Sequence, residues 1–508
     1  MLLTSALLAA SLLAAAEDPA AVYLANARKA LEAGNFEKAK SQLDLAVEAN
    51  PQSAEAWLML AGAEIQNGES TRAIEHFQHA LRLAPNSFAG HYDLALAYLH
   101  ERKLNDARRE LERAVTLNPR QPDAAYNLGI VLLEMENPRE SITYFQRARS
   151  LNPGRPDVAF NLVRAELAAG DWPTASAEAR NYAHAFAGDA GWQASVGKLF
   201  LESGHAQEAA LLLQEARRLQ PASEEVRHLL ASAYLKSQQP DLLLSLIPEP
   251  KTPDERFLRG SALLVQHHLA EAESEAARAL EMAPNEARYL LLAGRIQQFQ
   301  GHQDQALELL RRAAGHAPRW AEPYYCMAVS YYFERRYDDA RRALNESLQR
   351  SPNSSRSLFL FAVTLINQGK NREAEAYLRR AIAIQPDNAR YRVHLGAAQL
   401  RDDRPAEAQI AFRQAIRLKP DYALPHYELG KLLAQSGHPH DALQELETAI
   451  QYEPGLVHAY YQLSRVAAAL GQREKSSQAL ATFNRLKKQE TDEQQGLSDD
   501  VNRELQHP

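Results

Sequence analysis

A proline returns at a fixed interval along most of this chain of 508 residues. The prolines of the series stand at positions 51, 85, 119, 153, 221, 250, 284, 318, 352, 386, 420 and 454. The interval between successive prolines of the series is constant, with two exceptions. The interval from Pro153 to Pro221 is twice as long, and the interval from Pro221 to Pro250 is shorter. A fixed period of this length is the signature of a solenoid, in which each repeat contacts only its neighbours. A single core is improbable at this length, because cores stop growing well before it.

Each repeat is predicted to be a pair of helices. Apolar residues follow the helical spacing in two runs, and a glycine or polar turn separates the runs. Glycine at this turn accepts the left-handed conformation that ends a helix, and the proline at the other turn stops the second helix. Aligned on the prolines, the chain divides into fourteen units: six of full length over 20–223, a short one over 224–252, and seven more of full length that end at residue 490.

Small side chains recur where the helices of a unit must approach each other. At one position of the first helix thirteen units carry Ala, Gly or Ser, and only Val163 departs. In the second helix an alanine series that runs from Ala46 to Ala449 is interrupted by Tyr182. Overfilling such a contact costs about 1 to 3 kcal/mol. We therefore expect the fifth unit, residues 156–189, to contact its neighbours differently from the others.

The second unit shows the complete pattern, which is carried by Trp57, Leu60, Ala61, Gly68, Ala73, Phe77, Ala80 and Pro85. With these residues, and with related residues over about nine-tenths of its length, the chain resembles the tetratricopeptide-repeat family, as a many-repeat exported member of bacterial type. The resemblance implies an all-α fold, a right-handed superhelical solenoid of antiparallel helix pairs with about 14 repeats. It also implies that the first helices line a concave groove that holds peptides or partner proteins.

The repeats give the expected domain organisation. It comprises an apolar segment over 1–16, an N-terminal block of six repeats over 17–223, an irregular shortened repeat over 224–256, a C-terminal block of seven repeats over 257–490, and an acidic tail over 491–508. The second helix of the shortened repeat is expected to be short, because a cluster of prolines follows it closely. Two interpretations stay open for this repeat: a hinge between the blocks, or a compact irregular repeat without motion.

The segment 1–16 is uncharged and apolar, and Glu17 and Asp18 follow it. The stretch is too short for a comfortable membrane span but suits the core of a signal peptide, with cleavage near Ala16. We therefore expect export to the periplasm or another extracytoplasmic compartment. Because the stretch holds no Lys or Arg, a membrane-anchored or cytoplasmic chain is the alternative.

The sequence contains no motif for catalysis, for a cofactor or for a metal. The histidines at 267, 268, 438 and 440 are interpreted as turn residues rather than ligands. The net charge is -7, and residues 489–508 hold six acidic residues against Arg503, so the repeats themselves are nearly neutral. A near-neutral body argues against a general nucleic-acid binder. We therefore expect a non-enzymatic protein without cofactor or metal.

The fifth position of each unit lies on the groove wall, by the family resemblance. Eight of the fourteen residues there are aromatic, where the overall aromatic content of 7% predicts about one. The family favours an aromatic residue here for packing alone, which is the alternative interpretation. Basic residues gather on the same wall in the later units, whereas earlier units carry acidic residues at their second position. The candidate partner-binding groove comprises Tyr92, Tyr126, Phe160, Phe257, Arg288, Arg295, Phe299, Tyr325, Tyr332, Phe333, Arg356, Phe359, Arg390, Tyr427, Lys431, Tyr461 and Arg465.

Exposed aromatic residues clustered with arginine are the usual composition of a binding hot spot. The first hypothesis is a non-catalytic scaffold or adaptor of the cell envelope, whose later units hold an acidic, aromatic-containing segment of a partner protein. The alternative is an accessory subunit that binds a glycan or lipid for a separately encoded enzyme of polysaccharide export or glycosyl transfer. Contact with a membrane is expected only through the N-terminal segment, if that segment is not cleaved.

Overall fold

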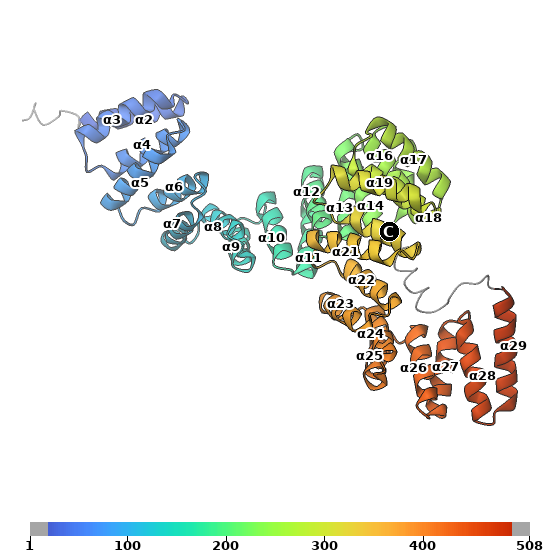
Figure 1. The fold of residues 1–508 in the computed structure, drawn as a ribbon. Coiled ribbons are helices and arrows are strands. Elements are labelled where there is room, and N and C mark those ends of the chain that lie inside the picture. Colours follow the sequence, from blue (N-terminus) through green and yellow to red (C-terminus); the bar gives the residue numbers. More distant parts are fainter. Residues whose placement is uncertain (1–18, 490–508) are drawn as a thin grey trace, which may run out of the picture. The chain divides into compact units, whose positions relative to one another are not determined.

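The computed structural model describes residues 19–489, and over that range it contains the helices α2 to α29 and no strand (Figure 1). The expected all-α solenoid of helix pairs is confirmed. The apolar segment 1–16 and the acidic tail 491–508, both predicted from the sequence, lie outside the described residues. Contacts divide the chain into an N-terminal unit, which ends at Ser237, and a C-terminal unit, which begins at Gln238.

The N-terminal unit contains α2 to α14. Its first helices are α2 (Pro19–Glu32), α4 (Ala54–Gln66), α6 (Phe88–His100), α8 (Pro122–Glu134), α10 (Pro156–Ala168), α12 (Ala190–Glu202) and α14 (Glu224–Lys236). Its second helices are α3 (Phe36–Ala49), α5 (Ser70–Leu83), α7 (Leu104–Leu117), α9 (Pro138–Leu151), α11 (Trp172–Ala185) and α13 (Ala206–Leu219).

The C-terminal unit contains α15 to α29. It starts with the short α15 (Pro240–Leu246), and its first helices are α16 (Pro253–Val265), α18 (Ala287–Phe299), α20 (Glu322–Phe333), α22 (Ser355–Asn367), α24 (Ala389–Arg401), α26 (Ala423–Gln435) and α28 (Val457–Ala469). Its second helices are α17 (Leu269–Met282), α19 (Gln303–His316), α21 (Tyr337–Arg350), α23 (Asn371–Ile384), α25 (Pro405–Leu418), α27 (Pro439–Tyr452) and α29 (Arg473–Gln489).

The turn inside each hairpin has the left-handed backbone that the glycine series predicts. Gly68 has φ 81° there, and its equivalents in seven other units also have positive φ. His267 stands at the same register in a unit that lacks the glycine, and it takes φ 59°. A non-glycine residue adopts this region at some cost, so the hairpin geometry overrides the local preference.

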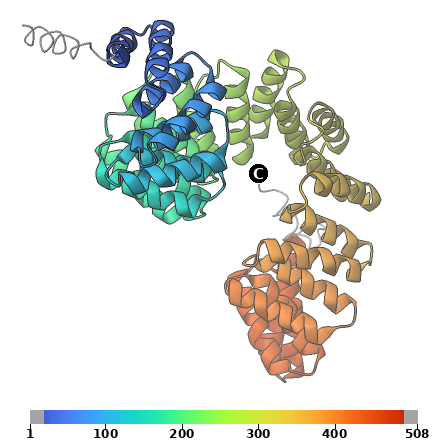
Figure 2. The same ribbon diagram turned by 90° about the vertical axis from the view of Figure 1, so that its left-hand side faces the viewer.

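Within a full-length hairpin the two helices pack on each other, and every second helix except α11 then packs on the first helix of the next hairpin (Figures 1 and 2). Gly129 of α8 faces the ring of Phe145 on α9, and a Cβ atom built on Gly129 would lie 2.7 Å from Phe145 Cε1. Gly396 of α24 faces Phe412 of α25 in the same way, at 2.6 Å. The large residue fills the space that the small one leaves, and both phenylalanines are fully buried.

The fifth hairpin exchanges these sizes. Val163 stands at the small position of α10, and Ala179 of α11 stands where most other units carry Phe or Leu. Val163 is fully buried and Ala179 is 2% exposed. The helices α10 and α11 nevertheless pack together less extensively than the two helices of any other full-length hairpin.

The contact of the fifth hairpin with the sixth is where the stack changes. Elsewhere in the N-terminal unit each second helix packs closely on the next first helix, but α11 does not pack in this way on α12, and α10 reaches α12 instead. Tyr182, which replaces alanine, stacks on Phe186 at 5.8 Å, and both rings meet Trp192 of α12, at 6.1 and 5.4 Å. These three rings fill the junction where alanine would let the helices approach, and they hold α11 away from α12.

A buried carboxyl group lies inside the same hairpin. Glu166 of α10 is 1% exposed, and neither of its carboxylate oxygens has a hydrogen-bond partner within the described range. The equivalent residue of the second hairpin, Glu64, bonds His76 at 2.8 Å, but the position of that histidine is taken by Glu178 in the fifth hairpin. Burial first, and then the charges of Glu178 and Asp171, raise the pKa of Glu166 to about 7.

The irregular repeat is assembled from one regular and one short helix. The helix α14 has 13 residues, as in a regular hairpin, whereas α15 has 7 and packs on α16. The division between the two units falls after Ser237, inside the range 224–256. Whether this range moves as a hinge stays a prediction.

The size rule, by which a small residue on the first helix leaves room for a large one on the second, predicts opposite effects for two glycine substitutions. Gly129→Ala should lower the free energy of unfolding by about 1 to 2 kcal/mol, because its methyl group must displace the buried ring of Phe145. Gly62→Ala, in the middle of α4 with no atom within 4 Å of the added Cβ, should raise it by about 0.5 to 1 kcal/mol. Urea unfolding followed by circular dichroism measures both. Equal effects of the two substitutions would contradict the size rule.

The buried Glu166 predicts a pH-dependent effect of Glu166→Gln. The pKa of Glu166 is higher in the folded chain than in the unfolded chain. The free energy of unfolding of the wild type is therefore highest below about pH 4.5, and it falls as the pH rises through 7. Glutamine mimics the protonated acid, so the variant should be similar to wild type at pH 4.5 and more stable by about 1 to 3 kcal/mol at pH 8. The exposed Glu202→Gln is the control in the same unfolding assay. A stability difference that does not change with pH would contradict the assignment.

Candidate functional site

A pocket of about 240 Å³ opens on the first helices α18, α20 and α22 of the C-terminal unit. Five residues predicted for the groove line it together: Arg295, Phe299, Tyr325, Phe333 and Arg356. Their positions follow from the repeat, because equivalent faces of successive first helices lie next to each other. The pocket therefore brings together five of the seventeen residues predicted for the groove.

The two arginines of the pocket differ in what holds them. Arg356 donates two hydrogen bonds to the carboxylate of Glu322, at 2.8 and 2.9 Å, and its guanidinium lies 4.7 Å from the ring centre of Tyr325. Arg295 is half-buried and has neither a hydrogen bond nor an ion pair from its side chain to any residue in 19–489. Arg295 is therefore the positive charge of the pocket that an incoming group can pair.

The base of the pocket is closed and unreactive. Gln298 donates to the carbonyl of Cys326 at 2.7 Å and to the hydroxyl of Ser330 at 2.8 Å. The Cys326 thiol is buried, and burial raises its pKa to about 12, so the thiolate that a nucleophile or metal ligand needs is absent at neutral pH. Gln303 also lines the pocket, and its side-chain oxygen is buried without a partner in the described part of the chain.

The rim of the pocket is aromatic. Phe333 is 41% exposed at the end of α20, and its ring meets Tyr332 edge-on at 6.0 Å. Phe299, at the end of α18, is half-buried and meets His267 edge-on at 5.8 Å. An exposed phenylalanine beside an unpaired arginine offers both an apolar and a charged contact.

Other predicted aromatic residues are tied to the neighbouring hairpin. Asn127 donates to the phenol of Tyr92 at 2.8 Å, and Asn161 donates to that of Tyr126 at 3.1 Å. In the C-terminal unit Asn367 donates to Tyr332 at 3.0 Å. These donors stand 35 residues after their acceptors. The bonds give the phenols a packing role, which was the alternative interpretation of the aromatic series.

Several predicted groove residues have little or no exposed surface. Phe359 is fully buried, with its ring centre 5.1 Å from Tyr391 and 4.9 Å from His394, so it belongs to the core and the sequence-based placement on the surface is wrong. Tyr325 and Tyr427 keep 6% and 9% of their surface. These two phenol rings therefore offer little surface to a partner.

The expected basic wall is partly neutralised. Arg288 pairs with Asp254 at 3.1 Å and with Glu286 at 3.0 Å, and Lys431 pairs with Glu428 at 2.6 Å. Asp254 and Glu322 each stand one repeat before the arginine that they hold. These pairs were not predicted from the sequence, although the spacing of one repeat between the acidic and the basic residue is a pattern from which they could have been inferred.

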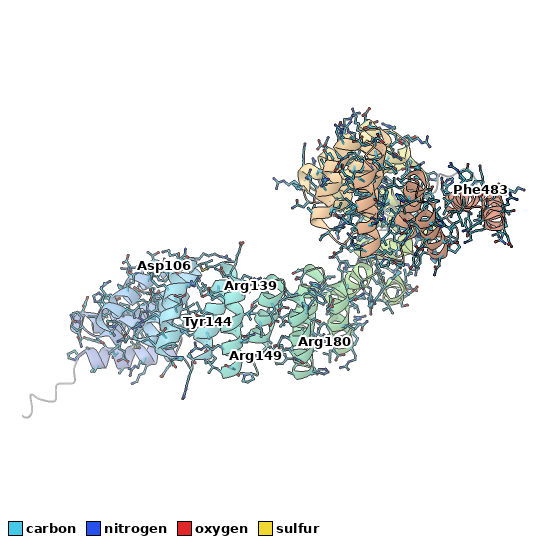
Figure 3. All side chains as sticks on the ribbon, turned by 90° about the horizontal axis from the view of Figure 1, so that it is seen from below. Asp106, Arg139, Tyr144, Arg149, Arg180 and Phe483 are labelled. Atoms are coloured by element: carbon cyan, nitrogen blue, oxygen red, sulfur yellow. The ribbon has the colours of Figure 1, made fainter. Side chains whose placement is uncertain are left out.

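The remaining predicted residues are distributed along the first helices. Phe160, Phe257 and Arg390 are half-buried, and the ring of Phe257 lies 5.7 Å from Tyr289. Tyr461 is 42% exposed, between the guanidinium of Arg465 at 6.0 Å and the ring of Phe483 at 5.3 Å; Phe483 is labelled in Figure 3. These residues do not line the pocket.

The described residues show no sign of a metal site or of a membrane-spanning helix. No cluster of three or more His, Cys, Asp or Glu side chains in residues 19–489 has the arrangement of a metal site. Of the expected turn histidines, His440 instead lies inside α27. Among the helices in the same range, none combines the length and apolar character needed to cross a membrane.

Comparisons with known proteins agree with the repeat pattern. Three models described as tetratricopeptide repeat match residues 24–88, 92–156 and 427–493, residues 132–199 and 334–397, and residues 389–422. No curated protein sequence matches the chain.

Many solved structures are similar to the chain, and three of them serve as examples. The crystal structure of the APC/C hetero-tetramer Cut9–Hcn1 has a TM-score of 0.45 and 14% identity, over 90% of this chain and 97% of that chain. Yeast Tom70 has a TM-score of 0.42 and 16% identity, over 86% and 99%. The crystal structure of MamA has a TM-score of 0.30 and 23% identity, over 32% and 95%. On the repeat models, which together match about two thirds of its residues, the chain belongs to the tetratricopeptide-repeat family.

Proposed function

We propose that this protein is a non-catalytic scaffold that holds a segment of a partner protein in the pocket on α18, α20 and α22. Tetratricopeptide repeats are protein-interaction modules, which supports the general class. The observation that carries the proposal is the unpaired guanidinium of Arg295 beside the exposed ring of Phe333 in one pocket. The segment would bring a carboxylate to Arg295 and an apolar or aromatic side chain to Phe333.

The chemistry of the pocket favours a carboxylate. A guanidinium binds a carboxylate through two parallel hydrogen bonds, which are charge-assisted and stronger than neutral ones. The half-buried position of Arg295 reduces the screening by water. Glu322 is occupied by Arg356, so the acidic group for Arg295 has to come from outside the pocket.

The size of the pocket favours a peptide side chain over a cofactor. Small-molecule sites usually have volumes of about 300 to 1,000 Å³. The pocket has about 240 Å³, which suits one large side chain of an extended segment. The exposed ring of Phe333 could also stack on a sugar, which keeps the glycan-binding accessory subunit as a second candidate.

The pocket predicts which peptides the protein selects. A random peptide library displayed against the full chain should be enriched for sequences with Asp or Glu close to Phe, Tyr or Trp. Arg295→Glu should weaken the best peptide by about tenfold or more, because it places like charges together, and Phe333→Ala should weaken it by a smaller factor. Fluorescence anisotropy measures both.

The control for this experiment is Arg278→Glu, which changes an exposed arginine on the second helix α17 and should leave the affinity unchanged. Enriched peptides without acidic residues, or an unchanged affinity for Arg295→Glu, would contradict the proposal. Displacement of the peptide by oligosaccharides would favour the glycan-binding candidate.

We also propose that the chain is exported from the cytoplasm, on the support of the apolar residues 1–16 and the small residues around Ala16. Cell fractionation beside a compartment marker should find the chain outside the cytoplasm, with a mature N-terminus near residue 17 by mass spectrometry. A full-length chain in the cytoplasm would contradict this proposal and leave the pocket unaffected.

A further inference from the structure

The displaced helix α11 opens a second cavity, of about 660 Å³, in the N-terminal unit. The helices α11 and α13 form its two walls, and Gln193 and Phe200 of α12 contribute to its floor. In the regular hairpins the close packing of a second helix on the next first helix fills this position. The cavity is therefore a slot between α11 and α13 with α12 at its floor, at the place that a regularly packed α11 would fill.

The walls of the slot are apolar and open to solvent. Trp172 of α11 is 44% exposed, and Leu211 of α13 is 63% exposed, the largest exposure among the big apolar side chains of residues 19–489. From Trp172 to His184 the lining residues of α11 extend over about 18 Å, or three helical turns. An apolar slot of this length matches the apolar face of a helix, which is a common mode of peptide recognition.

The floor of the slot holds an incomplete polar group. Gln193 is 1% exposed and lines the cavity. Its amide nitrogen donates to the carbonyl of Ala183 at 3.3 Å, but its side-chain oxygen has no partner in the described part of the chain. A buried acceptor without a donor is costly, so the residues around the floor leave one polar atom of the slot unsatisfied.

The two walls of the slot carry opposite charges. Arg180 on α11, labelled in Figure 3, and Glu208 on α13 both line it. Neither forms an ion pair with any of residues 19–489.

We propose that the slot between α11 and α13 binds an amphipathic helix of a partner protein. The apolar face of this helix lies between Trp172 and Leu211, the exposed apolar side chains of the two walls. A carboxylate on one flank pairs with Arg180, and a cationic side chain on the other flank pairs with Glu208. The unpaired charges of Arg180 and Glu208 thus specify the charge pattern of the occupant, and this site is independent of the pocket in the C-terminal unit.

The test uses the full chain and a designed helical peptide of about four turns, slightly longer than the slot and constrained by a side-chain staple. The peptide carries leucines at helical spacing, glutamates along one flank and lysines along the other; a second peptide carries glutamine on both flanks. The charged peptide should bind with a Kd at least about fivefold below that of the neutral one, and binding should shift the fluorescence of Trp172 to shorter wavelength. Trp172→Phe should remove most of this shift.

Three variants make the proposal falsifiable. Leu211→Asp should abolish binding, and Arg180→Glu should weaken the charged peptide by about fivefold or more without weakening the neutral one. Leu45→Asp, at another exposed leucine on the second helix α3, is the matched control and should change neither affinity. Both changed residues of the slot are exposed, so the fold should persist, which circular dichroism checks.

The proposal is overturned if neither peptide binds, if Leu211→Asp binds as the wild type does, or if both peptides bind equally. Self-association of the wild type that Leu211→Asp abolishes, measured by sedimentation, would also overturn it by assigning the slot to a second copy of the chain. Arg295→Glu should leave peptide binding unchanged, so failure of one proposed site does not decide the other.

Discussion

The close approach of two helices at a small side chain is the contact on which the whole molecule depends. In most hairpins a residue such as Gly129 on the first helix leaves room for a large side chain on the second, such as Phe145, and both are buried completely or nearly so. An interior packed in this way has no spare volume, so a change of one side chain must be matched by another or must move a helix. The structure contains one example of each response, and both occur in the fifth hairpin.

Inside that hairpin the sizes are exchanged, because Val163 is combined with Ala179 rather than with a phenylalanine or leucine, and α10 and α11 still pack on each other, although less extensively than in the other full-length hairpins. At its junction with the next hairpin the change is not matched. Tyr182, Phe186 and Trp192 together fill the contact between α11 and α12, and the helices separate. The slot with its unpaired Gln193 oxygen follows from this separation. A departure from the repeat thus creates a surface that the regular repeat does not have.

Most of the fold could be predicted from the sequence, because a repeat of fixed length specifies both the hairpin and its neighbours. The exposure of single aromatic residues could not. Phe333 and Phe359 have the same chemistry on neighbouring first helices, yet one is 41% exposed and the other fully buried. The difference arises from rings such as Tyr391, which belong to the next hairpin, and from where each ring lies along its helix. The slot could not be predicted either, because the sequence shows that Tyr182 replaces an alanine but does not show where α11 lies relative to α12.

Charge pairing between hairpins decides which arginines remain for a partner. Arg288 and Arg356 each find a carboxylate at the same position of the preceding hairpin. Arg295 has Ser261 and Val329 at the equivalent positions of the hairpins before and after it, so the stack supplies no carboxylate there. The guanidinium of Arg295 keeps its hydrogen-bonding capacity for a group from outside, at the cost of standing half-buried and unpaired. In a solenoid of nearly neutral repeats, a basic residue stays available for a partner where its neighbours in the repeat register cannot neutralise it, rather than where basic residues are most frequent.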